Sequence, residues 1–487
     1  MRSVMCPRPK AHELSAAKRE AALLDLGARW VIHGEEYDLS AFRAHHPGGS
    51  TALDLCRGSD ATALFEQFHV MTERHRKVLR KFRVRPDGGG GGGDGERRSL
   101  TSAFHEDIKA MVRDHFGGDA YAGHKASWEH LGHMALVFVA YAVGWAGWWR
   151  GDMVRGCVLL PVCAWLIMAN FAHDGSHHAV SRRPWVNELA LLTSSPLLYS
   201  YGSWYQQHCA SHHLETNDPN LDVDVQHHPF TRWHRSMLRD SATMTGCVNL
   251  FWHFTAFLVS TVNMSNVHPW KFVFVPWVQR HVLRVDLPPY FAPDNDLYVD
   301  ALKAQGKDAP HELAFFKVSG RMIRTGFLDG LRGLASVAAF FASVAFLATP
   351  FLRFPPATAA ALALLPYVVT SALFFTVTQI SHVQEPCQRD PKPTDDFFMR
   401  QATTSLDYAV HSELWRFLTG GLNVQGIHHV LPVVNSCHYT KLYPKFFAIC
   451  EKHGCAPAVA PGILAASYRH LKHVYDLGEL YTGPHLE

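Results

Sequence analysis

Histidines with helical spacing are the residues of this sequence whose types and positions point most directly to chemistry. His173 and His177 are four residues apart, and they follow an apolar run at 154–172. Residues with this spacing lie on one face of a helix, so both imidazoles can bind one metal from the same side. His178 follows directly. The segment therefore predicts part of a metal site at a membrane surface, although a histidine-rich helix end would look similar.

The same pattern recurs at two more places. Residues 208–213 read His-x-x-x-His-His, residues 425–429 read Gln-x-x-His-His, and His382 directly follows another apolar run. Imidazole is a suitable ligand for iron and leaves coordination positions open. Adjacent histidines point about 100° apart on a helix, so neighbours can serve different metals or hold a ligand in place. These groups together hold more imidazoles than one metal accepts, and we expect two metals.

Four apolar runs predict the elements that position these histidines. Hydrophobic residues make up 47% of the sequence and charged residues 18%, but the apolar residues are concentrated in runs long enough to cross a bilayer as helices. Two short loops join these runs in pairs, and two interrupted apolar segments, 187–205 and 249–262, are expected at the membrane interface. The expected spans are 131–149, 154–172, 334–352 and 357–378.

Two helical hairpins would return the chain twice to its starting side. Residues 1–130, 173–330 and 381–487 then face one compartment and contain every histidine group. Most Lys and Arg residues lie there too, which predicts a cytosolic side, although three arginines near the short loops oppose this orientation.

Composition excludes several other classes. The net charge of +3, without a basic tract interleaved with aromatics, argues against nucleic-acid binding. The ten cysteines form no Cys-x-x-Cys pair, which predicts reduced thiols, and residues 1–30 lack the apolar core of a cleavable signal. A zinc transporter would place ionisable groups near the middle of its spans, whereas these histidines follow the ends of the apolar runs.

Residues 29–86 carry a second motif set. A strand–turn–strand pattern begins at Trp30, His46 precedes Pro-Gly-Gly, and His69 follows twenty-three residues later. This segment resembles a cytochrome b5 domain, an α+β fold. The resemblance implies that His46 and His69 are the axial ligands of haem b, an arrangement that leaves iron no open position and favours electron transfer. Residues 1–28 are an N-terminal extension, and the glycine-rich stretch 87–98 predicts a flexible linker that tethers the domain and raises its effective concentration.

The three histidine groups together resemble the membrane fatty acid desaturases. Gln425, which opens the third group, and the N-terminal cytochrome b5-like domain are typical of the front-end members. The resemblance implies an all-α domain at 99–487 with four transmembrane helices, a cytosolic cap and a di-iron centre. Gln425 would be a weak ligand or shape the substrate pocket, and His178 stands where a small residue is commoner. The implied ligands are His173, His177, His178, His208, His212, His213, His382, His428 and His429.

The resemblance also implies a reaction. Two iron ions would activate O2, remove two hydrogens from neighbouring methylenes of a long polyunsaturated acyl chain, and receive electrons through the haem. The implied partners are the bilayer, a fatty acyl substrate linked to coenzyme A or phospholipid, and an NAD(P)H cytochrome b5 reductase in the endoplasmic reticulum membrane. The sequence around His173 and the lead-in to Gln425 are most similar to enzymes acting at carbon 4 or 5, delta-4 or delta-5.

Other interpretations share parts of this pattern. A sphingolipid long-chain base desaturase has the same third group and haem domain, and a lipid hydroxylase has the same metals and topology. From another class, a non-enzymatic membrane haem or metal protein would also carry histidines.

Residues beside the histidine groups are further candidates. Five polar residues are placed to hydrogen-bond ligand imidazoles or to lie in solvated loops: Asp174, Asn217, Asp218, Asp222 and Asp224. Four aromatic residues are candidates for lining an acyl tunnel, anchoring the membrane or ordinary packing: Trp204, Tyr205, Trp415 and Phe417.

Overall fold

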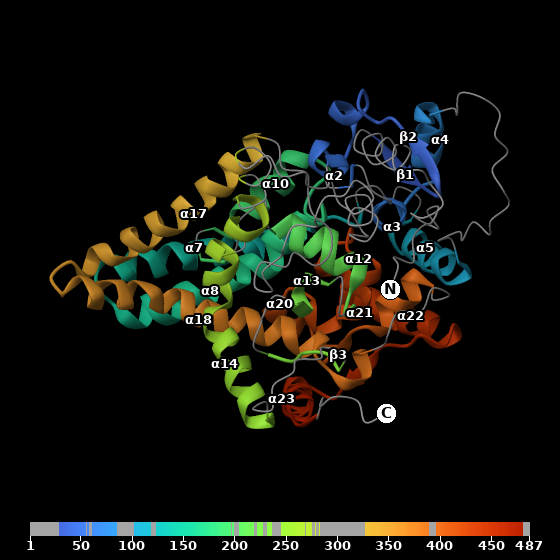
Figure 1. The fold of residues 1–487 in the computed structure, drawn as a ribbon. Coiled ribbons are helices and arrows are strands. Elements are labelled where there is room, and N and C mark those ends of the chain that lie inside the picture. The colour runs from blue at the N-terminus through green and yellow to red at the C-terminus, as the bar shows by residue number, and fades with distance from the viewer. Residues whose placement is uncertain are drawn as a thin grey trace, which may run out of the picture.

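The computed structural model describes residues 29–54, 56–57, 61–84, 102–117, 123–195, 197–198, 204–218, 222–226, 231–235, 245–267, 269–274, 278, 282, 327–388 and 396–480. The predicted N-terminal extension at 1–28 and the linker at 87–98 lie outside these residues. Figure 1 shows a small N-terminal domain beside a larger helical part from which two helical hairpins extend.

The N-terminal domain, residues 29–84, is a small α+β unit. An antiparallel pair, β1 (Trp30–Ile32) and β2 (Glu35–Tyr37), is followed by α2 (Ser50–Asp54), α3 (Thr62–Phe68) and α4 (Arg74–Leu79). The turn between the strands places His33 at φ 52° and Gly34 at φ 73°. Trp30, Ile32, Leu39 and Leu79 form the buried core between the strands and the helices.

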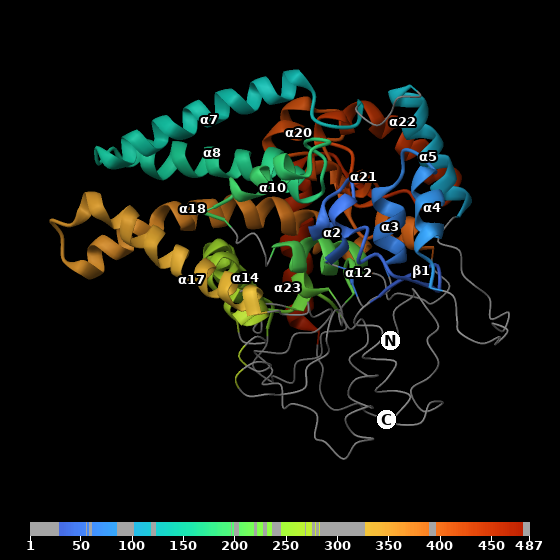
Figure 2. The ribbon, with the colours of Figure 1, turned by 90° about the horizontal axis from the view of Figure 1, so that it is seen from above.

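Within the described residues, four helices are long and apolar enough to cross a membrane. The first is α7 (Trp128–Trp149), and the second runs through Arg155–Ser176, with α8 (Leu160–Ile167) and α9 (His173–Ser176) joined by π-helical turns. The third span, Leu334–Phe351, lies mostly in α17 (Phe327–Ala348), and the fourth is α18 (Pro356–His382). Figures 1 and 2 show these helices extending together from the rest of the molecule.

The second and fourth helices continue beyond the apolar runs that predict them. The predicted spans end at 172 and 378, whereas the helices end at Ser176 and His382. Their last turns therefore carry His173 and His382, and the membrane helices themselves position these two side chains. At the other end of each hairpin lie only short loops, so the histidine groups share one end of the bundle (Figure 2).

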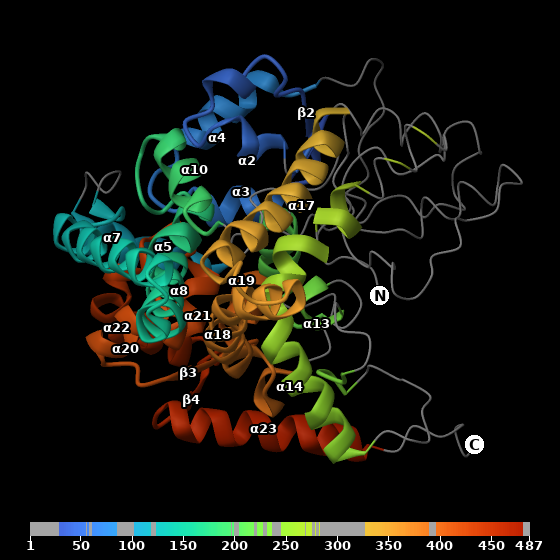
Figure 3. The same ribbon diagram turned by 90° about the vertical axis from the view of Figure 1, so that its left-hand side faces the viewer.

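The other described elements between residues 102 and 480 form a cap at that end. Its helices are α5 (Ala103–Phe116), α10 (Pro184–Leu192), α12 (His213–Glu215), α13 (Val223–Gln226), α14 (Gly246–Val262), α19 (Phe397–Thr403), α20 (Glu413–Thr419), α21 (Gln425–Val430), α22 (Tyr439–Lys452) and α23 (Ile463–Glu479). A parallel pair, β3 (Leu406–Tyr408) and β4 (Ala458–Ala460), is a small departure from the predicted all-α domain. Figure 3 shows that two of these cap helices, α14 and α23, meet at the bottom of the view.

The N-terminal domain is docked on the cap. Its residues Ala63, Val70 and Met71 belong to one buried cluster with Phe104 and Ile108 of α5. On another side, α2 lies beside α10, where Thr51 donates a hydrogen bond of 3.1 Å to Glu188. The glycine-rich composition of residues 87–98 predicts a tethered domain and gives no sign of this docking, which depends on side chains far apart in the sequence.

Candidate metal centre

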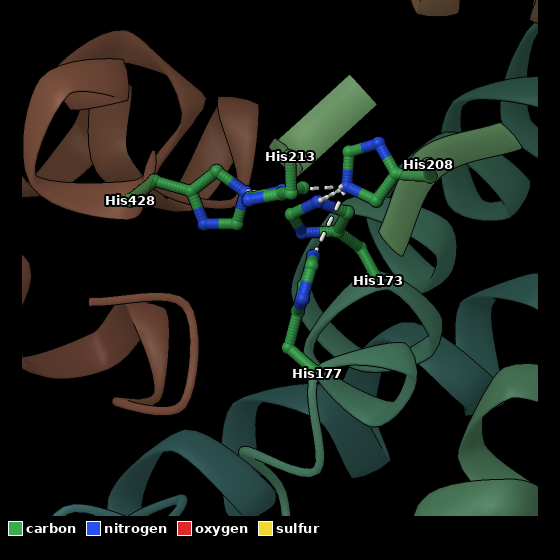
Figure 4. A group of neighbouring side chains, drawn as sticks. All are labelled: His173, His177, His208, His213 and His428. Atoms are coloured by element: carbon green, nitrogen blue, oxygen red, sulfur yellow. Dashed lines mark hydrogen bonds between the residues drawn. The ribbon is translucent and has the colours of Figure 1, made fainter. Parts of the chain in front are cut away.

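Five histidine side chains converge on one point at the end of the helical bundle. His208 Nε2 lies 2.9 Å from His173 Nε2, 3.0 Å from His177 Nε2 and 3.2 Å from His213 Nε2. His428 Nε2 lies 3.1 Å from His213 Nε2. Figure 4 shows the five rings pointing inward from separate segments of the chain, and all are buried. We call this set the first histidine group.

A second histidine group lies next to the first. The Nε2 atoms of His212 and His429 are each 3.2 Å from His382 Nε2. The Gln425 amide nitrogen lies 2.8 Å from His382 Nε2 and 3.2 Å from His429 Nε2. The structure thus divides eight of the nine predicted ligands between two adjacent sets, and it brings Gln425 to the smaller one.

Helix geometry explains how histidines that are close in the sequence are divided between the two histidine groups. Residues Tyr205–His212 form a π-helix, in which hydrogen bonds run from residue i to i+5. His208 and His213, five apart, therefore share the first group, while His212 turns to the second. In α9 the ordinary spacing of four holds, and His173 and His177 stay together. On α21, His428 and His429 point to different groups.

Both groups fit metal ions better than they fit a hydrogen-bonded cluster. A neutral imidazole has one N–H donor and one acceptor nitrogen, so five converging Nε2 atoms cannot all satisfy one another. Burial holds the pKa of His208, His213, His428 and His429 well below the usual value, with neighbouring histidines adding to the effect. These four rings are therefore neutral at physiological pH and present lone pairs to the points where the groups converge, as metal binding requires.

The opposite ring nitrogens are held by residues around the groups. His212 Nδ1 lies 3.0 Å from Asp222 Oδ2, His429 Nδ1 lies 3.1 Å from Gln401 Oε1, and His428 Nδ1 lies 3.2 Å from the Tyr439 hydroxyl. Burial lowers the pKa of His212, but the carboxylates of Asp222 and Asp224 outweigh it and raise the pKa above its usual value. Such contacts orient the rings and increase their basicity as ligands.

The other polar residues beside the histidine groups have different partners. Asp174 accepts hydrogen bonds of 2.8 Å from Asn435 and Ser436, which fixes the loop after α21 rather than a ligand ring. Asn217 donates to the carbonyl oxygens of His382 and Thr404. Asp218 is buried, and its backbone N–H donates to the carbonyl of Glu215.

His178 lies outside both histidine groups. Its backbone has a φ of 55°, which turns the chain away from α9. Its ring stacks with Tyr205 at 6.4 Å and faces a large cavity between the two domains. Among the nine predicted ligands it is the one that the structure does not place with the others.

The aromatic candidates also separate. Trp204 stacks on His208 with ring centroids 4.3 Å apart and lines a small cavity of about 40 Å³ beside both groups, together with Met168, Met264 and Phe374. Tyr205 lines the larger cavity. Trp415 and Phe417 both lie on α20, and the ring of Phe417 packs against His133 of α7.

The larger cavity, about 550 Å³, contains the predicted haem ligands. The rings of His46 and His69 face each other with centroids 6.2 Å apart. His46 Nδ1 lies 3.0 Å from the carbonyl of Gly49, and His69 Nδ1 lies 2.7 Å from the carbonyl of Phe65, so each Nδ1 donates and each Nε2 keeps its lone pair. A Cβ on Gly48 would lie 2.9 Å from the His46 ring. The cavity therefore fits a haem held by two imidazoles.

Comparison with known proteins decides the family. Residues 152–458 match the model described as fatty acid desaturase. The match covers more than half of the chain and includes the three histidine motifs at 173–178, 208–213 and 425–429. The chain belongs to the fatty acid desaturase family. In this desaturase, residues 17–86 match a cytochrome b5-like heme/steroid binding domain. The family is one of iron-dependent oxidoreductases, and the N-terminal domain implies haem.

Three curated relatives of the desaturase align with more than nine tenths of its length. An acyl-lipid omega-13 desaturase of Chlamydomonas reinhardtii is 30% identical, with 93% of this chain and 94% of the relative aligned. The Delta(5) fatty acid desaturase A of Dictyostelium discoideum is 25% identical over 92% of this chain and 90% of the relative. An acyl-lipid (8-3)-desaturase of Mortierella alpina is 25% identical over 92% and 93%.

Sequence reasoning misses several residues of the desaturase site. Gln401 and Tyr439 hold ligand rings but lie outside every recognisable motif. Asp407 accepts hydrogen bonds from the backbone of Gly426 and from Tyr443, which fixes the start of α21. No spacing rule points to these residues, because each reaches the site through the tertiary fold.

Proposed function

We propose that this desaturase inserts a cis double bond between existing double bonds and the carboxyl end of a long polyunsaturated acyl chain, at carbon 5 or carbon 4. The observation that carries the proposal is the pair of buried histidine groups beside a haem pocket. Two relatives support it, because they are named as Delta(5) fatty acid desaturases.

The chain's own residues would perform three tasks. His173, His177, His208, His213 and His428 would hold one iron, while His212, His382 and His429, with Gln425, would hold the other. When bound, the two irons would supply oxygen activation: dioxygen would be reduced to two waters by two hydrogens from the acyl chain, two electrons delivered one at a time through the haem, and two protons from solvent. Met168, Trp204 and Phe374 form an apolar wall beside the groups that would keep the methylenes in place and exclude water.

Further parts of the proposal concern the surroundings. The acyl carrier would be coenzyme A or a phospholipid, and a cytochrome b5 reductase would reduce the haem with NAD(P)H. Both sites would face the cytosol from the endoplasmic reticulum membrane, because the histidine groups and the N-terminal domain share one end of the bundle (Figure 1). Reporter tags in the loops near Arg150 and Arg353 would map to the lumen if this orientation holds.

The double-bond position is tested by feeding acyl chains of two lengths. A host without polyunsaturated lipids would express the desaturase and receive eighteen-carbon and twenty-carbon chains with the same double bonds counted from the methyl end. A new bond at carbon 5 in both would show counting from the carboxyl end. A bond thirteen carbons from the methyl end would instead lie at carbon 5 of the eighteen-carbon chain and at carbon 7 of the twenty-carbon chain. That result would match the name of the Chlamydomonas relative.

The same experiment separates the alternatives. Unsaturated sphingoid bases would indicate the long-chain base desaturase, and hydroxylated chains would indicate the hydroxylase. If the products of wild type and His428→Ala do not differ for any acyl chain or sphingoid base, the catalytic assignment is wrong. His46→Ala should separately abolish the low-spin haem spectrum, and its persistence would contradict the haem ligands.

A further inference from the structure

The cavity around His46 and His69 has two chemically different walls. The haem domain (residues 29–84) supplies a mostly apolar wall that includes Ile32, Leu39 and Leu53, together with the polar residues Thr72, Arg74 and His75. The desaturase domain (residues 102–480) supplies the opposite wall, and that wall includes His124, Lys125, Ser181, Arg182 and Asn187. Haem b has the same asymmetry, because its macrocycle is apolar and its two carboxylates lie at one edge.

Lys125 brings a positive charge to the polar wall. Its ammonium group donates a hydrogen bond of 2.7 Å to the carbonyl oxygen of His178, a neutral acceptor. Among the described residues, no carboxylate forms an ion pair with Lys125. Lys125 is half-buried and Arg182 is exposed, and both line the cavity, so two cations face the space between the domains. A cation beside apolar surface is stabilised when an anion lies near it.

The two walls are held together by direct contacts. The turn that carries His46 meets α10, where a Cβ on Gly49 would lie 3.1 Å from the side chain of Pro184. Thr51 on the haem domain donates to Glu188 on α10, and Figure 3 shows α2 next to α10. Arg182 immediately precedes this helix. The cationic wall is therefore fixed against the axial ligands rather than carried on a separate surface.

We propose that the desaturase domain completes the haem site, with Lys125 and Arg182 binding the haem carboxylates. Ammonium and guanidinium groups form strong charge-assisted hydrogen bonds with carboxylates. The haem would then be shared by both domains, and its binding would stabilise their docking. This inference rests on the haem ligands assigned above and concerns residues outside the cytochrome b5-like domain.

Matched substitutions in the full-length holoprotein test the proposal. Arg182→Met is compared with Arg183→Met, because both arginines are exposed but only Arg182 lines the cavity. Lys125→Met is compared with Lys77→Met, an exposed lysine of α4 that also does not line it. The measurements are the rate of haem release to an excess of apo-globin and the midpoint potential of the haem in detergent.

The two cavity variants, Lys125→Met and Arg182→Met, should release haem about 10- to 100-fold faster than wild type. The control variants, Lys77→Met and Arg183→Met, should release it at the wild-type rate. The midpoint potentials of the cavity variants should fall, since a nearby cation favours the reduced haem, which carries one positive charge fewer. Equal release rates and potentials in cavity variants and controls would overturn the proposal. A wild-type protein without a low-spin haem would instead overturn the assignment of His46 and His69.

A second probe changes the haem as well as the protein. Wild type is reconstituted with haem and with its dimethyl ester, in which both carboxylates are blocked. The ester should be released about 10-fold faster or more from wild type and from Arg183→Met. In the double variant Lys125→Met/Arg182→Met, haem and ester should be released at the same rate. An ester effect of equal size in the double variant would show that other groups bind the carboxylates.

Discussion

Gln67 Nε2 donates a hydrogen bond of 2.9 Å to the carbonyl oxygen of His429, a residue 362 positions later in the chain. The donor lies on α3 of the haem domain, and both residues are fully buried. The next residue, Phe68, stacks on His177 with ring centroids 6.4 Å apart. The helix that leads to the haem ligand His69 therefore contacts residues of both histidine groups.

Removing this hydrogen bond should slow electron transfer from the haem to the metal centre. Gln67→Ala leaves the carbonyl of His429 buried without its donor, which costs about 1–3 kcal/mol and corresponds to roughly 5- to 150-fold in docking equilibrium. The low-spin haem spectrum should persist. The measurement is the rate at which reduced haem is reoxidised in the presence of substrate and O2, with Lys77→Ala as the control. Unchanged reoxidation in Gln67→Ala would show that docking does not depend on this bond.

Gln425 should contribute to the second histidine group through its oxygen. As placed, its Nε2 faces His382 and His429, while its buried Oε1 has no hydrogen-bond partner among the described residues. The two amide orientations have nearly the same shape, and rotating the amide turns the oxygen towards the imidazole nitrogens. Gln425→Leu should therefore lower metal affinity or activity roughly 10- to 100-fold, whereas Gln425→His should retain iron. Equal iron content in Gln425→Leu and wild type, by elemental analysis, would contradict this role.

Adjacent histidines should have opposite phenotypes. His177 belongs to the first histidine group, whereas His178 faces the haem cavity. His177→Ala should lose iron and keep its haem spectrum. His178→Ala should keep its iron and alter haem release or potential. Iron and haem are quantified on the same preparations, and iron loss in His178→Ala would return this residue to the ligand set.

Acid should loosen the docking of the haem domain through Glu73. This carboxylate lies 2.7 Å from Arg113 and 3.4 Å from Lys109, both on α5, and 2.8 Å from Arg76. Desolvation raises the pKa of Glu73, but hydrogen bonds from Arg113 and Arg76 and the charge of Lys109 lower it to about 2 from an ordinary value of 4.5. The ionised form therefore stabilises docking above the ordinary pKa, and that contribution is lost as the pH falls from 4.5 through about 2.

Hydrogen exchange in α4 and α5 measures this effect at about pH 5 and about pH 3. Glu73→Gln should exchange faster than wild type at the higher pH and should show a smaller change on acidification. The side chain is 48% exposed, so salt should reduce the difference. Identical acid responses in the variant and wild type would rule out Glu73 as the group responsible.

Spacing rules predict the chemistry of the site better than its arrangement. His173 and His177 are adjacent on α9 as the i, i+4 rule predicts, and the four apolar helices occur where apolar runs are longest. The division of His208, His212 and His213 depends on a π-helix, which no local pattern of the sequence indicates. Asp222 is recognisable by its position beside a histidine group, but Gln401 and Tyr439 become neighbours of the ligands only through tertiary packing.

Because α3 and α5 share a buried core, the haem domain of each molecule should reach only the metal centre of the same polypeptide. Because Ala63, Val70 and Met71 are buried against the desaturase domain, the haem domain cannot leave to serve a second molecule without exposing this apolar surface. A copy lacking its haem ligand and a copy lacking a metal ligand should therefore fail to complement each other in one membrane. Electron transfer from the haem to the metal centre would then take place within one polypeptide, and one molecule could not supply electrons to another.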